Sequence, residues 1–284
     1  MGRVEGKVAL ITGAARGQGR SHAVRLAEEG ADIIAIDICD DIEVVDYALG
    51  TAEELEETAR LVEKAGRRIV TKRADVRDRA ALDTAVAEAV AELGRLDVVI
   101  ANAAIGPIGP GPLNAFTDVV DVNLVGVLNT VHATLPHTGE GASFILIGSS
   151  ASFFGAPGDA GMMGMMGPGG LGYPYAKQML GHYISWFAPF LSPSGRRINV
   201  VHPTNVDTPM LHNENMYKIF RPDLEHPTRE ETEPAFTGMH GMPIPYVEPI
   251  DISHAVTYLA SDESRYVTGI QLRIDGGSVV KAGK

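Results

Sequence analysis

A tyrosine and a lysine four positions apart, Tyr173 and Lys177, are the pair in this sequence best suited to acid–base chemistry. In a helix this spacing places both side chains on one face. A phenol has an unperturbed pKa of about 10, and a neighbouring ammonium lowers that pKa because it favours the phenolate. The pair therefore predicts a proton acceptor that works near neutral pH. The hydroxyl of Ser150, which follows an apolar run, would hold a substrate oxygen beside it.

A glycine-rich turn near the start of the chain provides the context for this pair. Apolar residues at 8–11 predict a buried strand, and Gly13, Gly17 and Gly19 then open a helix. Glycines in this arrangement permit a tight turn, close approach of the backbone to a pyrophosphate, and close packing of helix on strand. The free N–H groups and positive dipole end of a helix start favour an anion. The turn thus predicts a dinucleotide site, although the glycine spacing alone fits a plain structural turn equally well.

The carboxylate of Asp37 and the guanidinium of Arg16 point to different dinucleotides. Asp37 follows the second predicted strand, 31–36, and lies eighteen positions after Gly19. This is close to the roughly twenty positions at which such folds place an acid against the ribose hydroxyls of NAD. Arg16 would instead attract the 2′-phosphate of NADP. We expect NAD, because Asp37 would lie directly at the ribose whereas Arg16 can face solvent.

The rest of the chain alternates between strand and helix patterns. Further strands are predicted at 68–72, 96–100 and 143–147, and helices at 21–29, 52–64, 78–93, 113–135 and 173–190. This alternation predicts an α/β fold, a doubly wound parallel sheet of about seven strands with helices on both faces. We find no linker, so residues 1–284 are expected to form one Rossmann domain. Ligands should gather at the carboxyl ends of the strands.

Three segments lie outside this alternation. The loop 38–51 is longer than usual and is either a cover over the adenosine half of a cofactor or a surface loop. Residues 158–170 are rich in glycine and contain Met162, Met163, Met165 and Met166. Such an insert is flexible and apolar, so it either roofs a hydrophobic substrate or is a disordered or interface-packing segment. Residues 210–248 are expected to be a substrate lid, with Met210, Met216, Phe220, Phe236 and Met239 pointing inwards.

Composition excludes several classes of partner. The net charge of −12 argues against nucleic acid or an anionic membrane surface, because either requires a basic face. No apolar run approaches the roughly 18 residues that span a bilayer. The single cysteine, Cys39, makes an internal disulfide impossible and favours the cytoplasm; we expect a buried structural thiol. No metal is expected, since the spacing of the histidines His212, His226 and His240 is unlike that of a ligand set. Trp186 is expected in the core or at a subunit contact.

Taken together, these motifs resemble the short-chain dehydrogenase/reductase family over nearly the whole chain. Its cofactor turn, N-A-G motif, P-G-x-V-x-T segment and last-strand signature are matched by residues 12–19, 102–104, 203–208 and 274–277. Its catalytic residues are matched by Asn123, Ser150, Tyr173 and Lys177. The cofactor contacts that the resemblance implies are Gly13, Arg16, Gly17, Gln18, Gly19, Asp37, Ile38, Asp75, Val76, Asn102, Ala103, Ala104, Tyr173, Lys177, Pro203, Val206 and Thr208.

Within that family the sequence resembles the mycofactocin-associated, carveol-dehydrogenase-like branch of actinobacteria. The resemblance implies oxidation of a secondary alcohol, such as a terpene alcohol, to its ketone. It also implies a homotetramer and an NAD that stays bound and is reoxidised in place through mycofactocin, with loop 38–51 as the cause of retention. Two other functions remain open. One is an NADPH-dependent carbonyl reductase with exchangeable cofactor. The other is a non-catalytic NAD-binding sensor, against which the intact set of Ser150, Tyr173 and Lys177 speaks.

Three departures from the family pattern accompany this resemblance. Ala104 and Thr204 stand where the family usually has glycine, so each adds a side chain where the backbone passes near the cofactor. Ser150 and Tyr173 are 23 positions apart, farther than the family's usual spacing, and segment 158–170 contains the surplus. We expect Ser150 rather than Ser149 to be the catalytic hydroxyl, because Ser149 would increase that surplus.

Overall fold

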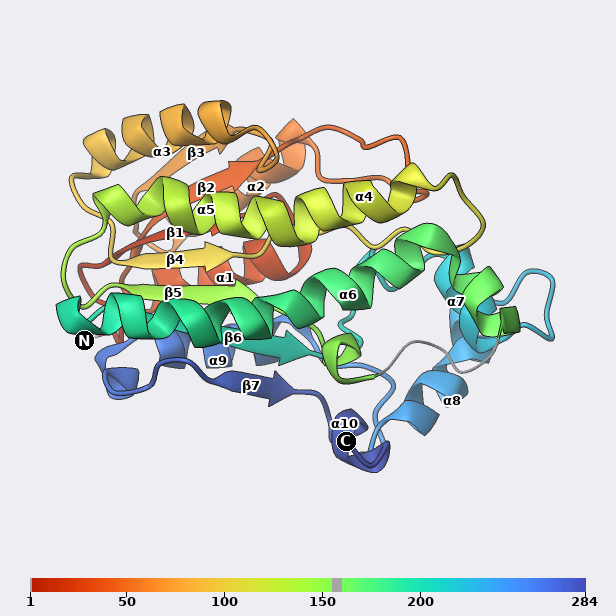
Figure 1. Cartoon of the computed structure of the whole chain (residues 1–284). Coiled ribbons are helices and arrows are strands. Elements are labelled where there is room, and N and C mark those ends of the chain that lie inside the picture. The colour runs from red at the N-terminus through yellow and green to blue at the C-terminus, as the bar shows by residue number, and fades with distance from the viewer. Residues whose placement is uncertain (1, 155–159) are drawn as a thin grey trace.

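A parallel sheet of seven strands forms the centre of the molecule, in the order β3-β2-β1-β4-β5-β6-β7 (Figure 1). The computed structural model describes residues 2–154 and 160–284. Its strands are β1 Val8–Thr12, β2 Asp32–Asp37, β3 Ile69–Arg73, β4 Val98–Ala101, β5 Ser143–Ile147, β6 Arg197–Pro203 and β7 Gln271–Ile274. The strand order reverses beside β1, whose neighbours are β2 and β4, so a crevice opens there at the carboxyl ends. The predicted α/β Rossmann class is confirmed.

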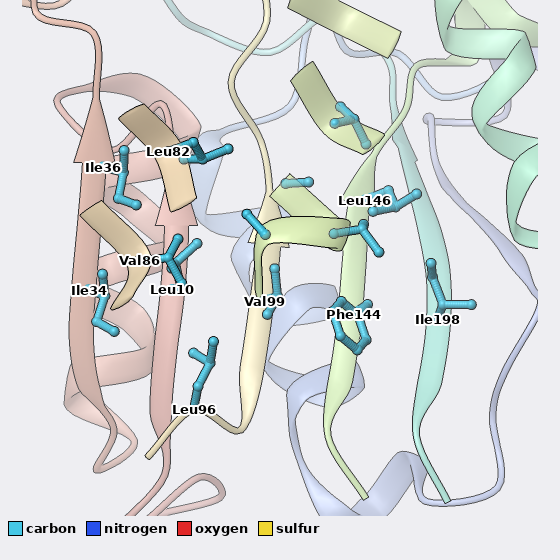
Figure 2. Packing of buried hydrophobic residues seen from close by; sticks show 14 of the residues in the cluster. Leu10, Ile34, Ile36, Leu82, Val86, Leu96, Val99, Phe144, Leu146 and Ile198 are labelled. Carbon is cyan, nitrogen blue, oxygen red and sulfur yellow. The ribbon is translucent and has the colours of Figure 1, made fainter. Parts of the chain in front are cut away.

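Helices cover both faces of the sheet because the strands are apolar on both sides. The main helices are α1 Gly17–Glu28, α2 Ala52–Lys64, α3 Arg79–Leu93, α4 Asn114–Val120, α5 Gly126–Thr134, α6 Ala160–Leu191 and α9 Pro249–Ala260. In β1, Leu10 packs toward α3 and α5 in the cluster that Figure 2 shows, whereas Ala9 and Ile11 pack with α1 and α9. Alternate residues of one strand thus contribute to two cores.

Two predicted helices differ from those in the structure. The predicted helix 113–135 contains a π-helical turn, Asp121–Val125, between α4 and α5. The predicted helix 173–190 begins earlier, because α6 already starts at Ala160 and bends at Gly167, which has a φ of 64°. A Cβ on Gly167 would lie 1.8 Å from the carbonyl oxygen of Gly109. The described part of the 158–170 insert is therefore helical, and Gly167 allows a close backbone contact.

The smaller helices gather at the carboxyl ends of the strands. These are α7 Glu214–Phe220, α8 Arg229–Met239 and α10 Ser278–Lys281. Figure 1 shows α7 and α8 beyond the arrowheads of the sheet, at the end where the long loop after β2 also lies. Among the described helices, none is both long enough and apolar enough to cross a membrane.

Candidate active site

The carboxyl ends of the strands surround one cavity of about 670 Å³. Every predicted site residue except Asn123 lines it. The cavity runs from the glycine turn after β1 to the apolar side chains of α7, and so joins the predicted cofactor and substrate ends. The topology explains this meeting, because the carboxyl ends of parallel strands share one edge of the sheet.

Tyr173 and Lys177 both reach this cavity from α6. The Nζ atom of Lys177 lies 5.8 Å from the centroid of the Tyr173 ring. It also donates a hydrogen bond of 2.7 Å to the carbonyl oxygen of Ile147, the last residue of β5. Lys177 is only 1% exposed, so this bond fixes a buried amino group at the strand end.

Burial shifts the pKa values of this pair in opposite directions, away from each other. It raises the pKa of the Tyr173 phenol, and a hydrogen bond with the side chain of Ser149 acts in the opposite direction. It lowers the pKa of Lys177 from 10.5 to about 7. The expectation that the lysine lowers the tyrosine pKa is therefore wrong for the protein's own groups. Loss of hydration penalises the charged form of each side chain, and that effect dominates here.

The hydroxyl beside the Tyr173 phenol is that of Ser149, which corrects the choice of Ser150. Ser149 has extended backbone angles, φ −163° and ψ 150°, and directly precedes the 3-10 turn Ser150–Phe153. Its Oγ also accepts a hydrogen bond from the backbone N–H of Ala151 at 3.1 Å. Ser150 lines the same cavity, but the chain has already turned there, so its hydroxyl is not the one that bonds the phenol.

A buried histidine, His202, fixes the position of Ser149. Its Nδ1 lies 3.2 Å from the backbone nitrogen of Ser149 and 2.9 Å from its carbonyl oxygen. The ring packs so tightly on the strand end that a Cβ on Gly148 would lie 2.5 Å from Nδ1. His202 was not predicted from the sequence, although it stands immediately before the matched segment 203–208, whereas Ser149 was considered and Ser150 preferred.

Asn123 lies in the π-helical turn and does not line the cavity. Its side chain is fully buried and pairs twice with Ile105. Its Oδ1 accepts from the backbone N–H at 2.8 Å, and its Nδ2 donates to the carbonyl oxygen at 2.7 Å. Both ends of the amide are therefore occupied, and the side chain holds the loop after β4 rather than a substrate. Single π turns of this kind often occur at functional sites.

The glycines of the turn show two of the predicted features, a tight turn and close packing of the helix start. Gly13 and Gly17 have φ values of 67° and 55°, which side chains rarely adopt. A Cβ on Gly19 would lie 2.0 Å from the carbonyl oxygen of Gly13, so only glycine lets α1 start this close. Asn102 closes the turn from β4, since its Nδ2 donates to the carbonyl oxygens of Thr12 and Gly13 at 2.9 and 3.1 Å.

Asp37 and Arg16 occupy different positions in the adenosine end. Asp37 is 8% exposed and lines the cavity, where its carboxylate accepts hydrogen bonds from the backbone N–H groups of Ala15 and Cys39. Arg16 donates instead to the carbonyl oxygen of Ala48 in the loop 38–51. Arg16, whose guanidinium was the reason to consider NADP, is thus bonded to the loop 38–51.

The walls between these ends contain the remaining predicted contacts. They are Gln18, Ile38, Asp75, Val76, Ala103, Ala104, Pro203, Val206 and Thr208. Thr204, one of the departures, also lines the cavity, and its Oγ1 lies 2.8 Å from Nε2 of the buried His240. His240 in turn bonds the Phe236 carbonyl oxygen through Nδ1 at 2.9 Å, so this threonine attaches α8 to β6.

The substrate end is mainly apolar. Its side chains are Ile108, Phe154, Met166, Met210, Leu211, Met216, Ile219, Phe220 and Met239. Four of the five predicted lid residues are among them, whereas Phe236 is fully buried behind Phe220. Of the insert methionines, Met166 lines the cavity, Met163 and Met165 are exposed, and the side chain of Met162 lies outside the described part. Residues 158 and 159 of the predicted insert also lie outside it.

Three other predictions concern residues outside the cavity. Trp186 is 85% exposed, which rules out the core. Cys39 is half-buried, and burial raises its pKa to about 11. His212 and His226 contact Asp207 and Glu214, and His240, which directly follows α8, is buried. Within residues 2–154 and 160–284, no three side chains are grouped as metal ligands.

Tyr47, in the covering loop, is another residue that sequence reasoning missed. It lines the cavity, and its hydroxyl accepts a hydrogen bond of 2.9 Å from the backbone N–H of Gly106. Ile42 of the same loop is buried against Ile105 and Val122. The aromatic residue in an otherwise acidic loop was the signal that pointed to this contact.

Comparison with known proteins identifies the family. A family model described as enoyl-(acyl carrier protein) reductase matches residues 13–279. A short-chain type dehydrogenase/reductase of Mycolicibacterium smegmatis is 47% identical, over 99% of both chains. The chain belongs to the short-chain dehydrogenase/reductase family. A relative in it, (−)-trans-carveol dehydrogenase of Rhodococcus erythropolis, is 45% identical over 99% of this chain and 100% of that protein.

Two solved members of this dehydrogenase/reductase family contain NAD. The carveol dehydrogenase of Mycobacterium avium in complex with NAD has a TM-score of 0.92 and 47% identity, over 99% of this chain and 100% of that one. A short-chain dehydrogenase of Mycobacterium paratuberculosis bound to NAD has a TM-score of 0.84 and 41% identity, over 98% and 100%. These relatives confirm the predicted family. They also confirm the predicted enzyme class, which is an NAD-using alcohol dehydrogenase, and NAD as the predicted cofactor.

Proposed function

We propose that this protein oxidises a hydrophobic secondary alcohol of the carveol type to its ketone, with NAD as the hydride acceptor. The observation that carries the proposal is the position of the Tyr173 phenol and the Ser149 hydroxyl in a cavity whose far end is lined by methionine, leucine, isoleucine and phenylalanine. Such a lining suits an apolar molecule with one oxygen. The names of the two carveol dehydrogenases agree with this substrate class.

The residues at the adenosine end fit NAD. Gly17 has a backbone that only glycine adopts readily, and the helix that starts there directs N–H groups at the cavity. Asp37 presents a carboxylate for ribose hydroxyls at the end of β2. When bound, NAD supplies an acceptor for the hydride that leaves the carbinol carbon. Arg16 bonds the covering loop, which speaks against the NADPH-dependent alternative.

The protein's own groups handle the proton and the substrate oxygen. Tyr173 as phenolate accepts the hydroxyl proton of the alcohol, and Ser149 donates a hydrogen bond to the oxygen as charge develops on it. Lys177, bonded to Ile147, lies beside the phenol and presents its Nζ donors toward the ribose position. Asn123 keeps the loop after β4 in place through Ile105. Ser149 thus takes the role that the sequence assigned to Ser150.

We further propose that NAD stays bound between turnovers and passes its electrons to an external acceptor, for which the family resemblance suggests mycofactocin. Support comes from the loop 38–51, which lines the cavity from Gly50, beside Asp37, to Tyr47, beside Gly106. The contacts of this loop near Asp37 and Gly106 must break before a dinucleotide leaves.

A cytoplasmic homotetramer of single-domain subunits completes the proposal. Leu113 near α4, and Trp186 and Phe190 on α6, are 81%, 85% and 68% exposed. Trp186 and Phe190 lie one turn apart on α6, and large apolar side chains exposed side by side mark interaction surfaces. Size-exclusion chromatography with light scattering should give four times the chain mass, and a monomer would contradict this assembly.

Turnover of carveol with two alternative electron acceptors tests the function. The purified protein is incubated with carveol and either added free NAD or an artificial electron-accepting dye. We expect carvone to form with the dye and little turnover with free NAD alone. Steady production of NADH from free NAD would overturn cofactor retention, and no carvone under either condition would overturn the substrate class.

A further inference from the structure

The hydroxyl of Tyr47 crosses from the cofactor cover to the substrate end of the cavity. It accepts the backbone N–H of Gly106, 59 positions further along the chain, at 2.9 Å. A Cβ on Gly106 would lie 3.6 Å from both the Tyr173 ring and the Sδ of Met210. Gly106 therefore forms part of the wall beside the phenol, and Tyr47 holds that wall.

A second contact connects the same loop to the lid. The carboxylate of Asp46 accepts a hydrogen bond from the side chain of Asn215. Asn215 lies in α7, which also contains the cavity residues Met216 and Phe220. The loop that covers the adenosine end is thus bonded to two elements that enclose the substrate end.

We propose that Tyr47 is a positioning residue that couples the two ends of the cavity, so that an occupied substrate end slows the release of NAD. The inference rests on the proposed retention of NAD. A ketone or alcohol packed against Gly106 and Met210 restricts the motion of the cavity wall to which Tyr47 is bonded. The loop 38–51 then opens less often. By linkage the effect is reciprocal, and bound NAD must strengthen substrate binding by the same factor.

Exchange of bound NAD tests this coupling. The holoenzyme is loaded with isotope-labelled NAD and chased with unlabelled NAD, with and without saturating carvone, a ketone that cannot take a hydride from oxidised NAD. Tyr47→Phe removes the hydroxyl and keeps the ring. Tyr266→Phe makes the same chemical change at a side chain that is 89% exposed and serves as the matched control. Asn215→Ala removes the second contact and leaves the first.

We expect carvone to slow exchange in the wild type and in Tyr266→Phe. Tyr47→Phe should exchange roughly three- to tenfold faster without carvone, the effect of one lost hydrogen bond, and should lose the carvone effect. Asn215→Ala should exchange faster but keep part of that effect. If wild-type NAD exchanges within the mixing time, retention itself fails and the coupling with it. If the wild type retains NAD but Tyr47→Phe matches Tyr266→Phe, or carvone slows both equally, only the coupling is overturned.

Discussion

Substitution of Ser149 and of its neighbour Ser150 separates the two hydroxyls that the sequence could not distinguish. Ser149→Ala removes the group that bonds the Tyr173 phenol and lies next to the reacting oxygen. Loss of one hydrogen-bond donor to a developing oxyanion costs roughly 2.7–4 kcal/mol in the transition state, or about 10²–10³ in kcat. Ser150→Ala deletes a hydroxyl in the same cavity that does not bond the phenol, and we expect a change in kcat of less than about threefold.

Dye-linked oxidation of carveol measures kcat and KM for both variants. Ser149 also caps the turn that follows it, through its bond to Ala151, so Ser149→Ala should lose about 1 kcal/mol of stability as well. Thermal unfolding corrects for that loss, and Ser149→Thr, which keeps the hydroxyl, should retain a measurable share of kcat. If Ser150→Ala were the more damaged variant, the assignment drawn from the phenol's hydrogen bond would be refuted.

Further predictions concern the acid–base pair and the lid. Tyr173→Phe should lose about 10²–10⁴ in kcat and still contain bound NAD, as measured after denaturation; preserved activity would remove the phenol from proton transfer. Alcohol oxidation should accelerate with rising pH and ketone reduction should slow, because burial raises the pKa of the phenol whose deprotonated form accepts the proton; a flat profile would contradict this. Folded Lys177 loses its proton above a pH of about 7, whereas in the unfolded chain it keeps it up to 10.5, so the unfolded state binds more protons between these values. Urea unfolding of NAD-stripped protein should therefore show wild-type stability rising relative to Lys177→Met by up to ~1.4 kcal/mol per pH unit in that window; parallel curves would argue against a buried neutral lysine. Thr204→Gly should cost about 1–3 kcal/mol and raise KM because it removes the partner of the buried Nε2 of His240, and Thr204→Ser should restore both.

The fold was predictable from local patterns in the sequence. The helix at Ala52–Lys64 and the strand at Ser143–Ile147 have the predicted bounds. The first has a capping box between Thr51 and Glu54, and the second contains the apolar run 144–147, which a glycine follows. Such signals lie within a few residues of each other, so no tertiary information is needed to read them. The cofactor end was equally accessible, because its contacts follow directly after strands.

The substrate end required the tertiary structure. Ser149 and Ser150 are neighbours, and the point at which β5 ends decides which of them reaches the phenol. His202 packs on Gly148 at that point. The contact of Tyr47 with Gly106 joins positions with no local relation. Glycines in the 158–170 insert suggested flexibility, but Gly167 instead lets the backbone pack closely against Gly109. The pKa shift of Tyr173 depended on burial, which the spacing of two residues does not reveal.

A single-turnover measurement tests the central claim most directly, namely that this dehydrogenase oxidises its alcohol with an NAD that it already holds. Purified and extensively dialysed protein is mixed with carveol without added cofactor, and the near-ultraviolet absorbance of reduced nicotinamide is followed. We predict a rapid rise equivalent to one NADH per chain that added NAD does not increase. An absorbance that stays flat until free NAD is supplied, and then rises steadily, would contradict the account.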